Sequence, residues 1–479
     1  MMPHEWIAPA MFVALVVLLL LGYPVAFSLA ANGIFFALLG IHLNLLQPEL
    51  LQALPERIFG IMRNETLLAI PFFTFMGLVL ERSGMAEELL DTIGQLFGAL
   101  RGGLAYAVVF VGTLLAATTG VVAASVISMG LISLPIMMRY GYSHRLASGV
   151  IAASGTLAQI VPPSLVLIVL GDQLGRSVGD MYTGAFVPAL LLAAAYLVYV
   201  LVVTVVRPDA VPALPPAARI HHGWALAKRI VTALLPPLVL IFLVLGTIFL
   251  GIATPTEGGA MGAVGALALA LARRRLDISL LKQALESTTM LTSFVLFIVV
   301  GSTVFGLTFR AVDGDLWIER LFADLPGGAV GFLILVNALV FVLAFFLDFF
   351  EIAFIIVPLL APVAQALGID LVWFGVMLAV NMQTSFMHPP FGFALFYLRS
   401  VAPREVRTSD IYWGAVPFVL IQLVMVAAII AFPQMVMHYK GSASQADPGA
   451  FELQVPMPDA RQPETNSAQE EIERSLKRP

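Results

Sequence analysis

Long apolar stretches, separated by short polar segments, run from residue 6 to residue 438 of the chain. A helix that crosses a bilayer needs about 20 mostly apolar residues in succession. On this criterion the sequence predicts an all-α polytopic membrane protein with five spans in each half. The spans of the first half are 6–21, 24–41, 66–81, 145–171 and 184–206, and those of the second half are 230–250, 256–272, 284–309, 371–398 and 411–438.

Two further apolar segments, 103–138 and 329–367, are too long for one crossing and are interrupted near the middle. The interruptions are ATTG at 117–120 and LDFFE at 347–351. We expect each segment to enter and leave the membrane on the same side, as a re-entrant hairpin. Five crossings per half then place the start of the second half on the opposite side, so that the two halves are inverted repeats.

Proline and glycine positions support a duplication, because they recur at a nearly constant spacing. Pro135, Gly141, Pro162 and Pro163 recur 227 residues later as Pro362, Gly368, Pro389 and Pro390, and Gly22 and Gly33 recur 229 residues later as Gly251 and Gly262. The predicted organisation is a first repeat at 1–206, a polar linker at 207–229, a second repeat at 230–438 and a polar tail at 439–479. The tail lacks periodicity and is expected to be disordered.

Composition excludes several classes of protein. The chain has 479 residues, 60% hydrophobic and 11% charged, which is incompatible with a soluble domain. There is no cysteine for a disulfide or a thiolate metal site, and no basic tract that would bind nucleic acid. The sequence contains no nucleotide-binding loop, so an ion gradient is the expected energy source.

Lysine and arginine are distributed unevenly between the two predicted sides. With the N-terminus outside, fifteen of these residues fall on the inner side and five on the outer side, setting aside the tail. Since cytoplasmic loops carry the excess of positive charge, both termini are predicted to be periplasmic and the linker cytoplasmic. The first hairpin then opens to the cytoplasm and the second to the outside.

The fourth span of each half contains a polar, proline-interrupted stretch, SGTLAQIVPPS at 154–164 and NMQTSFMHPP at 381–390. Non-helical backbone at membrane depth is tolerated only against protein or a water-filled cavity. Paired helix breaks in inverted repeats point to a transport site near the midplane. Freed carbonyl groups can coordinate Na⁺, and N–H groups at helix starts favour an anion.

The candidate ion- or substrate-binding residues lie at the hairpin tips and on these broken spans. They are Thr118, Thr119, Gly120, Ser154, Gly155 and Thr156 in the first half, and Asp348, Glu351, Asn381, Gln383 and Thr384 in the second. The expected helix breaks are Pro162, Pro163, Pro389 and Pro390, which could instead be simple kinks. Na⁺ is expected near Thr119, Thr156, Asp348 and Asn381, with no other cofactor and no catalytic residue.

Asp348 and Glu351 are the most unusual of these residues, because a carboxylate at membrane depth costs about 3 kcal/mol or more. Two acids three residues apart would repel each other unless a cation or a proton lay between them. The alternative is that one of them only caps the second arm of the hairpin. His388 has a similar alternative, as a structural histidine beside the proline pair.

Three other segments favour structural roles. Glu257, at the start of a span, is expected to be a helix cap. The small-residue run at 258–270 favours close helix packing. The amphipathic stretch at 86–101 is expected to lie on the cytoplasmic membrane surface, as an arm between a scaffold and the first hairpin.

Three motifs, ATPTEGGAMGAVGAL, ASGVIAASGTLAQIVPPS and LPIMMRYGY, resemble the large membrane subunit of tripartite ATP-independent periplasmic (TRAP) transporters. The resemblance covers nearly all of residues 1–438. It implies a Na⁺-driven importer of organic acids in the bacterial inner membrane, of the elevator type. It also implies two partners, a periplasmic substrate-binding protein and a small four-helix membrane subunit.

Within this resemblance Asp348, Asn381 and both proline pairs match the family pattern. Ser125 stands where an acid is usual, Phe349 replaces a proline, and Glu351 is an additional acid. Ser385 and His388 also depart from the usual residues. These departures resemble a branch named for mannitol, chloroaromatic compounds and 2-oxo acids.

Two other functions compete with this reading. A stand-alone ion-coupled carrier or antiporter of the same architecture would transport without partners. A membrane scaffold or intramembrane enzyme would need a nucleophile–base or metal constellation, for which only His388 with Asp348 offers a candidate.

Overall fold

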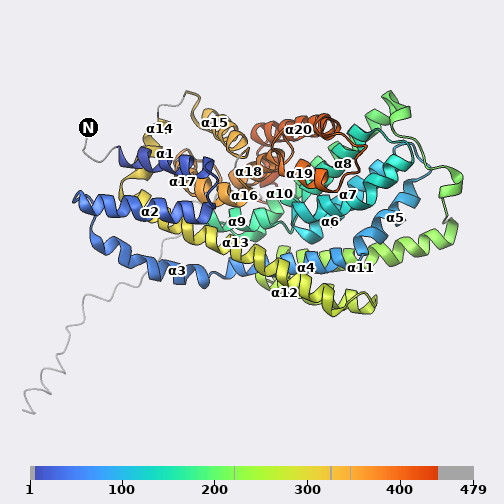
Figure 1. Ribbon diagram of the computed structural model, residues 1–479, viewed down its shortest axis with the longest axis horizontal. Helices are drawn as coiled ribbons and strands as arrows, with labels where there is room; N and C mark the ends of the chain where they lie inside the picture. Colours follow the sequence, from blue (N-terminus) through green and yellow to red (C-terminus); the bar gives the residue numbers. More distant parts are fainter. Residues whose placement is uncertain (1–5, 221, 324–325, 346, 441–479) are drawn as a thin grey trace, which may run out of the picture. The chain divides into compact units, whose positions relative to one another are not determined.

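The computed structural model describes residues 6–220, 222–323, 326–345 and 347–440, and every regular element in these ranges is a helix (Figure 1). The predicted all-α class is therefore confirmed. Of the predicted disordered tail at 439–479, all but Tyr439 and Lys440 lies outside the described residues.

The helices of the first half follow the predicted spans closely. They are α1 (Ile7–Leu20), α2 (Val25–His42), α4 (Glu65–Arg82), α5 (Met85–Phe97), α6 (Gly103–Thr119), α7 (Val122–Arg139), α8 (His144–Thr156), α9 (Leu165–Gln173) and α10 (Val178–Val206). A helix that the sequence did not indicate, α3 (Leu54–Met62), follows a 3₁₀ turn at Pro48–Ala53 and meets α4 at a bend of 46°.

The second half contains α11 (Gly223–Phe249), α12 (Pro255–Ala272), α13 (Ile278–Ala311), α14 (Gly314–Ala323), α15 (Gly328–Leu343), α16 (Phe349–Glu351), α17 (Val357–Ala366), α18 (Leu371–Ser385), α19 (Phe393–Val401), α20 (Thr408–Ala431) and α21 (Gln434–Met437). Two boundaries were predicted wrongly. Helix α11 already begins at Gly223, inside the expected linker. The last span ends at Ala431, because Pro433 restricts the preceding residue and cannot donate a helical hydrogen bond.

Seven stretches of the described chain are long and apolar enough to cross a membrane. They are α2, α7, α10, α11, α13, α20 and Phe349–Ala366, which joins α16 to α17. Two of them, α7 and Phe349–Ala366, are arms of the predicted re-entrant hairpins. Length and composition do not distinguish a crossing from a re-entrant arm, so the re-entrant and inverted arrangement stays a prediction.

Small residues bring neighbouring helices into close contact, as the sequence indicated for 258–270. Helix α12 packs on α4, where a Cβ atom at Gly262 would lie 2.5 Å from Met76 Sδ. Thr254 and Glu257 form the expected capping box at the start of α12, with the Thr254 N–H donating to Glu257 Oε2 at 2.7 Å. Helices α8 and α20 approach even more closely, because Gly149 contacts the carbonyl of Gly414 and Gly414 contacts the carbonyl of Arg145. Neither glycine leaves room for a side chain.

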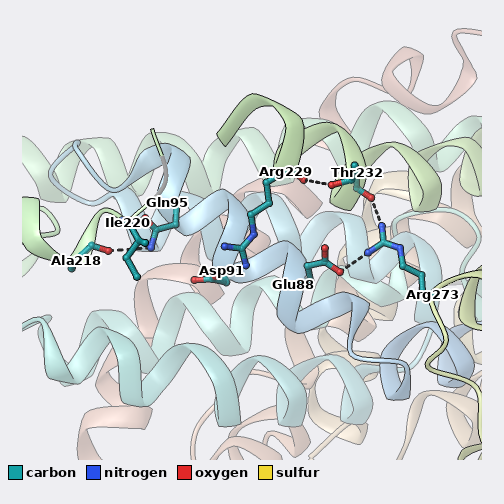
Figure 2. A network of polar contacts seen from close by, with 8 residues as sticks. All are labelled: Glu88, Asp91, Gln95, Ala218, Ile220, Arg229, Thr232 and Arg273. Atoms are coloured by element: carbon teal, nitrogen blue, oxygen red, sulfur yellow. Dashed lines mark hydrogen bonds and ion pairs between the residues drawn. The ribbon is translucent and has the colours of Figure 1, made fainter. Parts of the chain in front are cut away.

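Helix α5 corresponds to the predicted arm at 86–101, and its acidic face pairs with the second half (Figure 2). Glu88 accepts from Arg273 at the end of α12 at 2.5 Å, and Asp91 accepts from Arg229 of α11 at 2.6 Å. Gln95 donates to the carbonyl of Ala218 and accepts from the N–H of Ile220, both at 3.1 Å. The arm is therefore held by the linker and by two helices of the second half.

Candidate functional site

The first predicted hairpin consists of α6 and α7, with Gly120 and Val121 between them. The interruption was expected at 117–120, but Thr118 still lies in the last turn of α6, where its hydroxyl donates to the Leu115 carbonyl at 2.9 Å. Helix α6 ends at Gly120 because this residue adopts a left-handed φ of +59°. The side chain of Thr119 lies outside the described residues.

The tip of this hairpin contacts the break in the first interrupted span. A Cβ atom at Gly120 would lie 3.5 Å from the Pro163 carbonyl oxygen and 3.3 Å from Leu165 Cγ. Gly155 faces α7, where a Cβ atom would lie 3.1 Å from the Val126 nitrogen. The structure thus brings the predicted tip and the predicted break of the first half together.

The first break is shorter than the sequence indicated. Ser154, Gly155 and Thr156 form the last turn of α8, a 3₁₀ turn follows at Leu157–Gln159, and the non-helical part ends at Ser164. Ser164 caps α9, accepting from the Leu167 N–H at 3.4 Å and donating to the Gln159 carbonyl at 2.5 Å. The peptide bond Pro162–Pro163 is cis, as is Pro389–Pro390 in the second half.

The second predicted hairpin consists of α15 and an arm that begins with α16 and continues through a π-helical turn, Ile352–Ile356, into α17. Its interruption lies at 344–348, not at 347–351, because Asp348 and Glu351 start the second arm. Asp348 Oδ1 accepts from the Phe349 N–H at 2.6 Å, and Glu351 Oε2 accepts from the Asp348 N–H at 2.9 Å. This reciprocal capping box corresponds to the capping alternative for both acids.

Glu351 also lines a groove between this arm and two other parts of the chain. The opposite walls come from the turn between α1 and α2, including Tyr23 and Phe27, and from Ser293 and Phe297 of α13. The described residues of this groove include no lysine or arginine. Glu351 therefore brings the only charged side chain among these lining residues.

The second interrupted span consists of α18 and α19, and its break covers 386–392. Open backbone was expected from Asn381 onward, but Asn381, Gln383 and Thr384 are still helical. In the last turn of α18 the Thr384 and Ser385 hydroxyls donate to the carbonyls of Val380 and Asn381, both at 3.1 Å. Asn381 Nδ2 donates to the carbonyl of Asn337 on α15 at 2.8 Å.

Aromatic side chains join the second tip to the second break. The ring centroids of Phe349 and Phe386 are 6.0 Å apart, and those of Phe345 and His388 are 3.7 Å apart. His388 is buried between Phe345 and Phe341, and its ring nitrogens have no hydrogen-bond partner among the described residues. Nor does any hydrogen bond or ion pair join His388 to Asp348 there, so no nucleophile–base pair is formed.

The two interrupted spans meet at one buried polar cluster. Gln383 Nε2 donates to Thr156 Oγ1 and to the Tyr196 hydroxyl oxygen, both at 3.3 Å. Gln422 Nε2 donates to the same Tyr196 oxygen at 2.7 Å. All four side chains are inaccessible to solvent. Among the helices that carry these residues, α20 packs on α8, α10 and α18, and α10 also packs on α18 (Figure 1).

Tyr196 and Gln422 were missed by the sequence analysis. Both lie within long apolar helices, Tyr196 in AAAYLVYVL of α10 and Gln422 in VLIQLVM of α20. A polar residue facing the interior of a membrane helix bundle is the available signal, but the sequence does not show which way it faces.

Several polar atoms near this cluster have no hydrogen-bond partner in the part of the chain that the structure describes. They are Ser154 Oγ, Gln159 Oε1, Gln159 Nε2, Gln383 Oε1 and Gln422 Oε1. Buried polar groups are rarely left unpaired, so such atoms are usually completed by water, an ion or a ligand. Four of the five are oxygen atoms, and oxygen is the ligand atom that suits an alkali cation.

Comparison with known proteins identifies the class of this chain. The family model described as "Tripartite ATP-independent periplasmic transporter, DctM component" matches residues 12–435. The C4-dicarboxylate TRAP transporter large permease protein DctM of Pseudomonas aeruginosa is 30% identical over 390 residues, which are 81% of this chain and 89% of that protein. The sialic acid TRAP transporter large permease protein SiaM of Vibrio cholerae is 30% identical, covering 87% and 94%. The ectoine/5-hydroxyectoine large permease protein UehC of Ruegeria pomeroyi is 28% identical, covering 91% and 99%.

Two solved structures share the fold of this chain. The YdaH transporter of Alcanivorax borkumensis has a TM-score of 0.59 at 16% identity, covering 81% of this chain and 90% of that one. MtrF of Neisseria gonorrhoeae has a TM-score of 0.56 at 11% identity, covering 80% and 83%. At these identities the likeness concerns the fold alone. Taken with the family match over residues 12–435, it leads to one conclusion: the chain is a multi-pass membrane protein, not an enzyme, and belongs to the large, substrate-translocating permease subunits of TRAP transporters.

Proposed function

We propose that this chain imports an organic acid across the bacterial inner membrane, driven by Na⁺. A periplasmic binding protein delivers the substrate, and a small four-helix membrane subunit stabilises the large one. Both termini are periplasmic in this proposal. The observation that carries it is the contact between Thr156 and Gln383, where the two interrupted spans meet in a buried polar cluster.

The polarity of the helix ends suits a cation at this place. Helices α8 and α18 both end here, and the last carbonyl groups of a helix carry partial negative charge and lack helical partners. Thr156 donates its hydroxyl hydrogen to the Ala153 carbonyl at 2.8 Å and accepts from Gln383 Nε2 at 3.3 Å, which leaves one oxygen lone pair for a cation. Asn381 donates through Nδ2, so its amide oxygen is the group available to a cation.

Asp348 would add a negative charge to the second ion site. Its carboxylate caps α16, with Oδ1 accepting from the Phe349 N–H at 2.6 Å, and a carboxylate has further acceptor positions. A bound cation would offset the cost of keeping this charge at membrane depth. Capping and ion binding are therefore compatible roles for the same residue.

An anionic substrate would need positive charge that the groove itself does not supply. Because the described lining residues of the groove beside Glu351 include no lysine or arginine, neutralisation would come from bound Na⁺ and from helix N-termini. This arrangement ties uptake of the acid to occupation of the cation sites. The relatives are named for dicarboxylates, sialic acid and ectoines, so the substrate class follows the binding protein.

The groove also suggests which parts move. It separates the second hairpin from α13 and the α1–α2 turn. Helices α2 and α13 pack on each other, as do α4 and α12, whereas α7 and α20 pack on the interrupted spans α8–α9 and α18–α19. In the proposed elevator movement, the interrupted spans move together with α7 and α20. They carry the site past α2, α4, α12 and α13, which stay in place.

Reconstitution in proteoliposomes tests the proposal. With the binding protein and the small subunit present, uptake should follow an imposed Na⁺ gradient and should not follow an imposed proton gradient. Omitting either partner should abolish uptake. Transport by this chain alone would instead favour the stand-alone carrier, and uptake driven only by protons would refute Na⁺ coupling.

A further inference from the structure

A second concave site lies far from the polar cluster, where α8 and α20 begin and α10 ends. Its walls include Arg145 of α8, Val202, Val206 and Arg207 at the end of α10, and Trp413 and Pro417 of α20. The close contact between Gly414 and the Arg145 carbonyl joins α8 to α20 beneath it. The transport site uses none of these residues.

The charged side of this groove has an excess of positive charge. The Arg145 side chain is 62% exposed and donates from Nε to Asp410 Oδ1 at 3.2 Å, so its two terminal nitrogens are free to bind another group. Asp410 is thereby neutralised. Arg207 is exposed and makes no ion pair within the described ranges, and the acidic residue two positions on, Asp209, is exposed and does not line the groove. One uncompensated guanidinium group therefore remains.

The other side of the groove is apolar and continues along the two long helices. Val206 is 69% exposed and Trp413 is 63% exposed. Exposed apolar residues follow on α10 at Val198 and Leu201 and on α20 at Leu420 and Val424. A tryptophan between a polar end and an apolar stripe is typical of the membrane–water interface. The groove thus offers two arginines at the interface and a continuous apolar track leading away from them.

We propose that this groove binds an anionic phospholipid of the cytoplasmic leaflet. The guanidinium groups of Arg145 and Arg207 hold the phosphate, because a planar fork of N–H donors matches phosphate oxygens. An acyl chain lies along Val202 and Val206 and continues over the exposed residues of α10 and α20. A free phosphate ion would use only the charged half of this surface. The proposal depends on the predicted orientation, which places both arginines on the cytoplasmic side, and not on the transported substrate.

Native mass spectrometry of the purified full-length chain tests the site. Phosphatidylglycerol should bind more tightly than phosphatidylcholine of the same acyl chains. One arginine at an anionic headgroup contributes about 1 kcal/mol, so Arg207→Gln should weaken the first phosphatidylglycerol binding event about fivefold. Phosphatidylcholine binding should not change. Arg207→Gln leaves the Arg145–Asp410 pair intact, and thus preserves the bracing of α8 against α20.

Arg404→Gln is the matched control, because Arg404 is exposed on the same predicted side and does not line the groove. Equal binding of the two lipids, or equal effects of Arg207→Gln and Arg404→Gln, would overturn the proposal. Displacement of the lipid by inorganic phosphate at similar concentration would assign the site to a free anion instead. Because the readout is lipid binding, failure here leaves the transport proposal untouched.

Discussion

Thr156 and Gln383 lie 227 residues apart in the sequence, and their side chains are in contact, with Oγ1 and Nε2 separated by 3.3 Å. The same spacing relates the proline pairs of the two halves. In a duplicated fold these two residues are therefore equivalents of each other. A residue can touch its own equivalent only at the pseudo-twofold axis, which in inverted repeats lies in the membrane plane. The contact is what a twofold relation between the two halves predicts, and the inverted orientation of the halves stays a prediction.

Thr156→Val tests the proposed cation ligand at this axis. Valine keeps the shape of threonine but removes the oxygen and one acceptor for Gln383 Nε2. Since contacts with a charged group contribute about 1.5–3 kcal/mol, the Na⁺ concentration for half-maximal uptake should rise about tenfold or more. Thr247→Val is the control, because the Thr247 hydroxyl makes a similar bond to the Leu243 carbonyl but lies on α11. Equal Na⁺ dependence in the two variants would exclude Thr156 as a ligand.

Asp348→Asn separates the capping role of this residue from its charge. Asparagine is as good an N-cap as aspartate, so the start of α16 should be retained and the thermal unfolding temperature should hardly change. Na⁺ activation of uptake should be lost or strongly weakened. Asp277→Asn makes the same exchange at the N-cap of α13, where Asp277 accepts from the Leu280 N–H at 2.6 Å. Unchanged Na⁺ activation in Asp348→Asn would leave Asp348 with a purely structural role.

Gly155→Ala tests whether α8 must lie directly against α7. The added methyl group would meet Val126, and overpacking of this kind costs about 1–3 kcal/mol. We expect lower thermal stability and reduced uptake, with partial recovery in the double variant Gly155→Ala/Val126→Ala. Gly246→Ala, on α11, adds a methyl group with no atom within 4 Å and should stabilise its helix slightly. A loss of stability in the double variant as large as in Gly155→Ala would show that another contact is responsible.

The ion pairs between α5 and the second half are expected to stabilise the fold in a way that depends on salt concentration. Glu88→Gln and Arg273→Gln should each lower the free energy of unfolding by less than about 1 kcal/mol, because these side chains are partly exposed. The double variant should cost less than the sum of the two single variants. The difference between the cost of the double variant and the sum of the two single costs should shrink at high ionic strength, where exposed charges are screened. Strict additivity at low salt would show that the pair contributes nothing to stability.

The apolar helices and the helix breaks could be predicted because they depend on local sequence. Runs such as that of α2 satisfy the length requirement of a bilayer. The breaks lie at proline pairs flanked by polar residues, whereas the pair Pro236–Pro237, in a wholly apolar run, lies inside α11. Helices α3 and α14 were not predicted, because both are far shorter than the apolar run that a membrane span needs. The interruption of the second hairpin was predicted three residues too late. The sequence LDFFE does not show that Asp348 is the N-cap of the second arm.

The polar cluster itself could not be predicted from the sequence. Thr156 and Gln383 were both candidates, but their contact depends on how two distant spans pack. Tyr196 and Gln422 carry no motif, and their role appears only when α10 and α20 are placed beside α18. Which isolated polar side chains form hydrogen bonds with each other depends on how all the helices of the bundle pack.

The glycine contact between α8 and α20 has a practical consequence for measuring motion. With Gly149 and Gly414 backbone to backbone, nothing compressible separates these helices, and one cannot be displaced without the other. A pair of spectroscopic labels, one on each, would report an invariant separation throughout a turnover. That constant separation is a reference distance, and the movement of a third label on α2 or α13 can be measured relative to it.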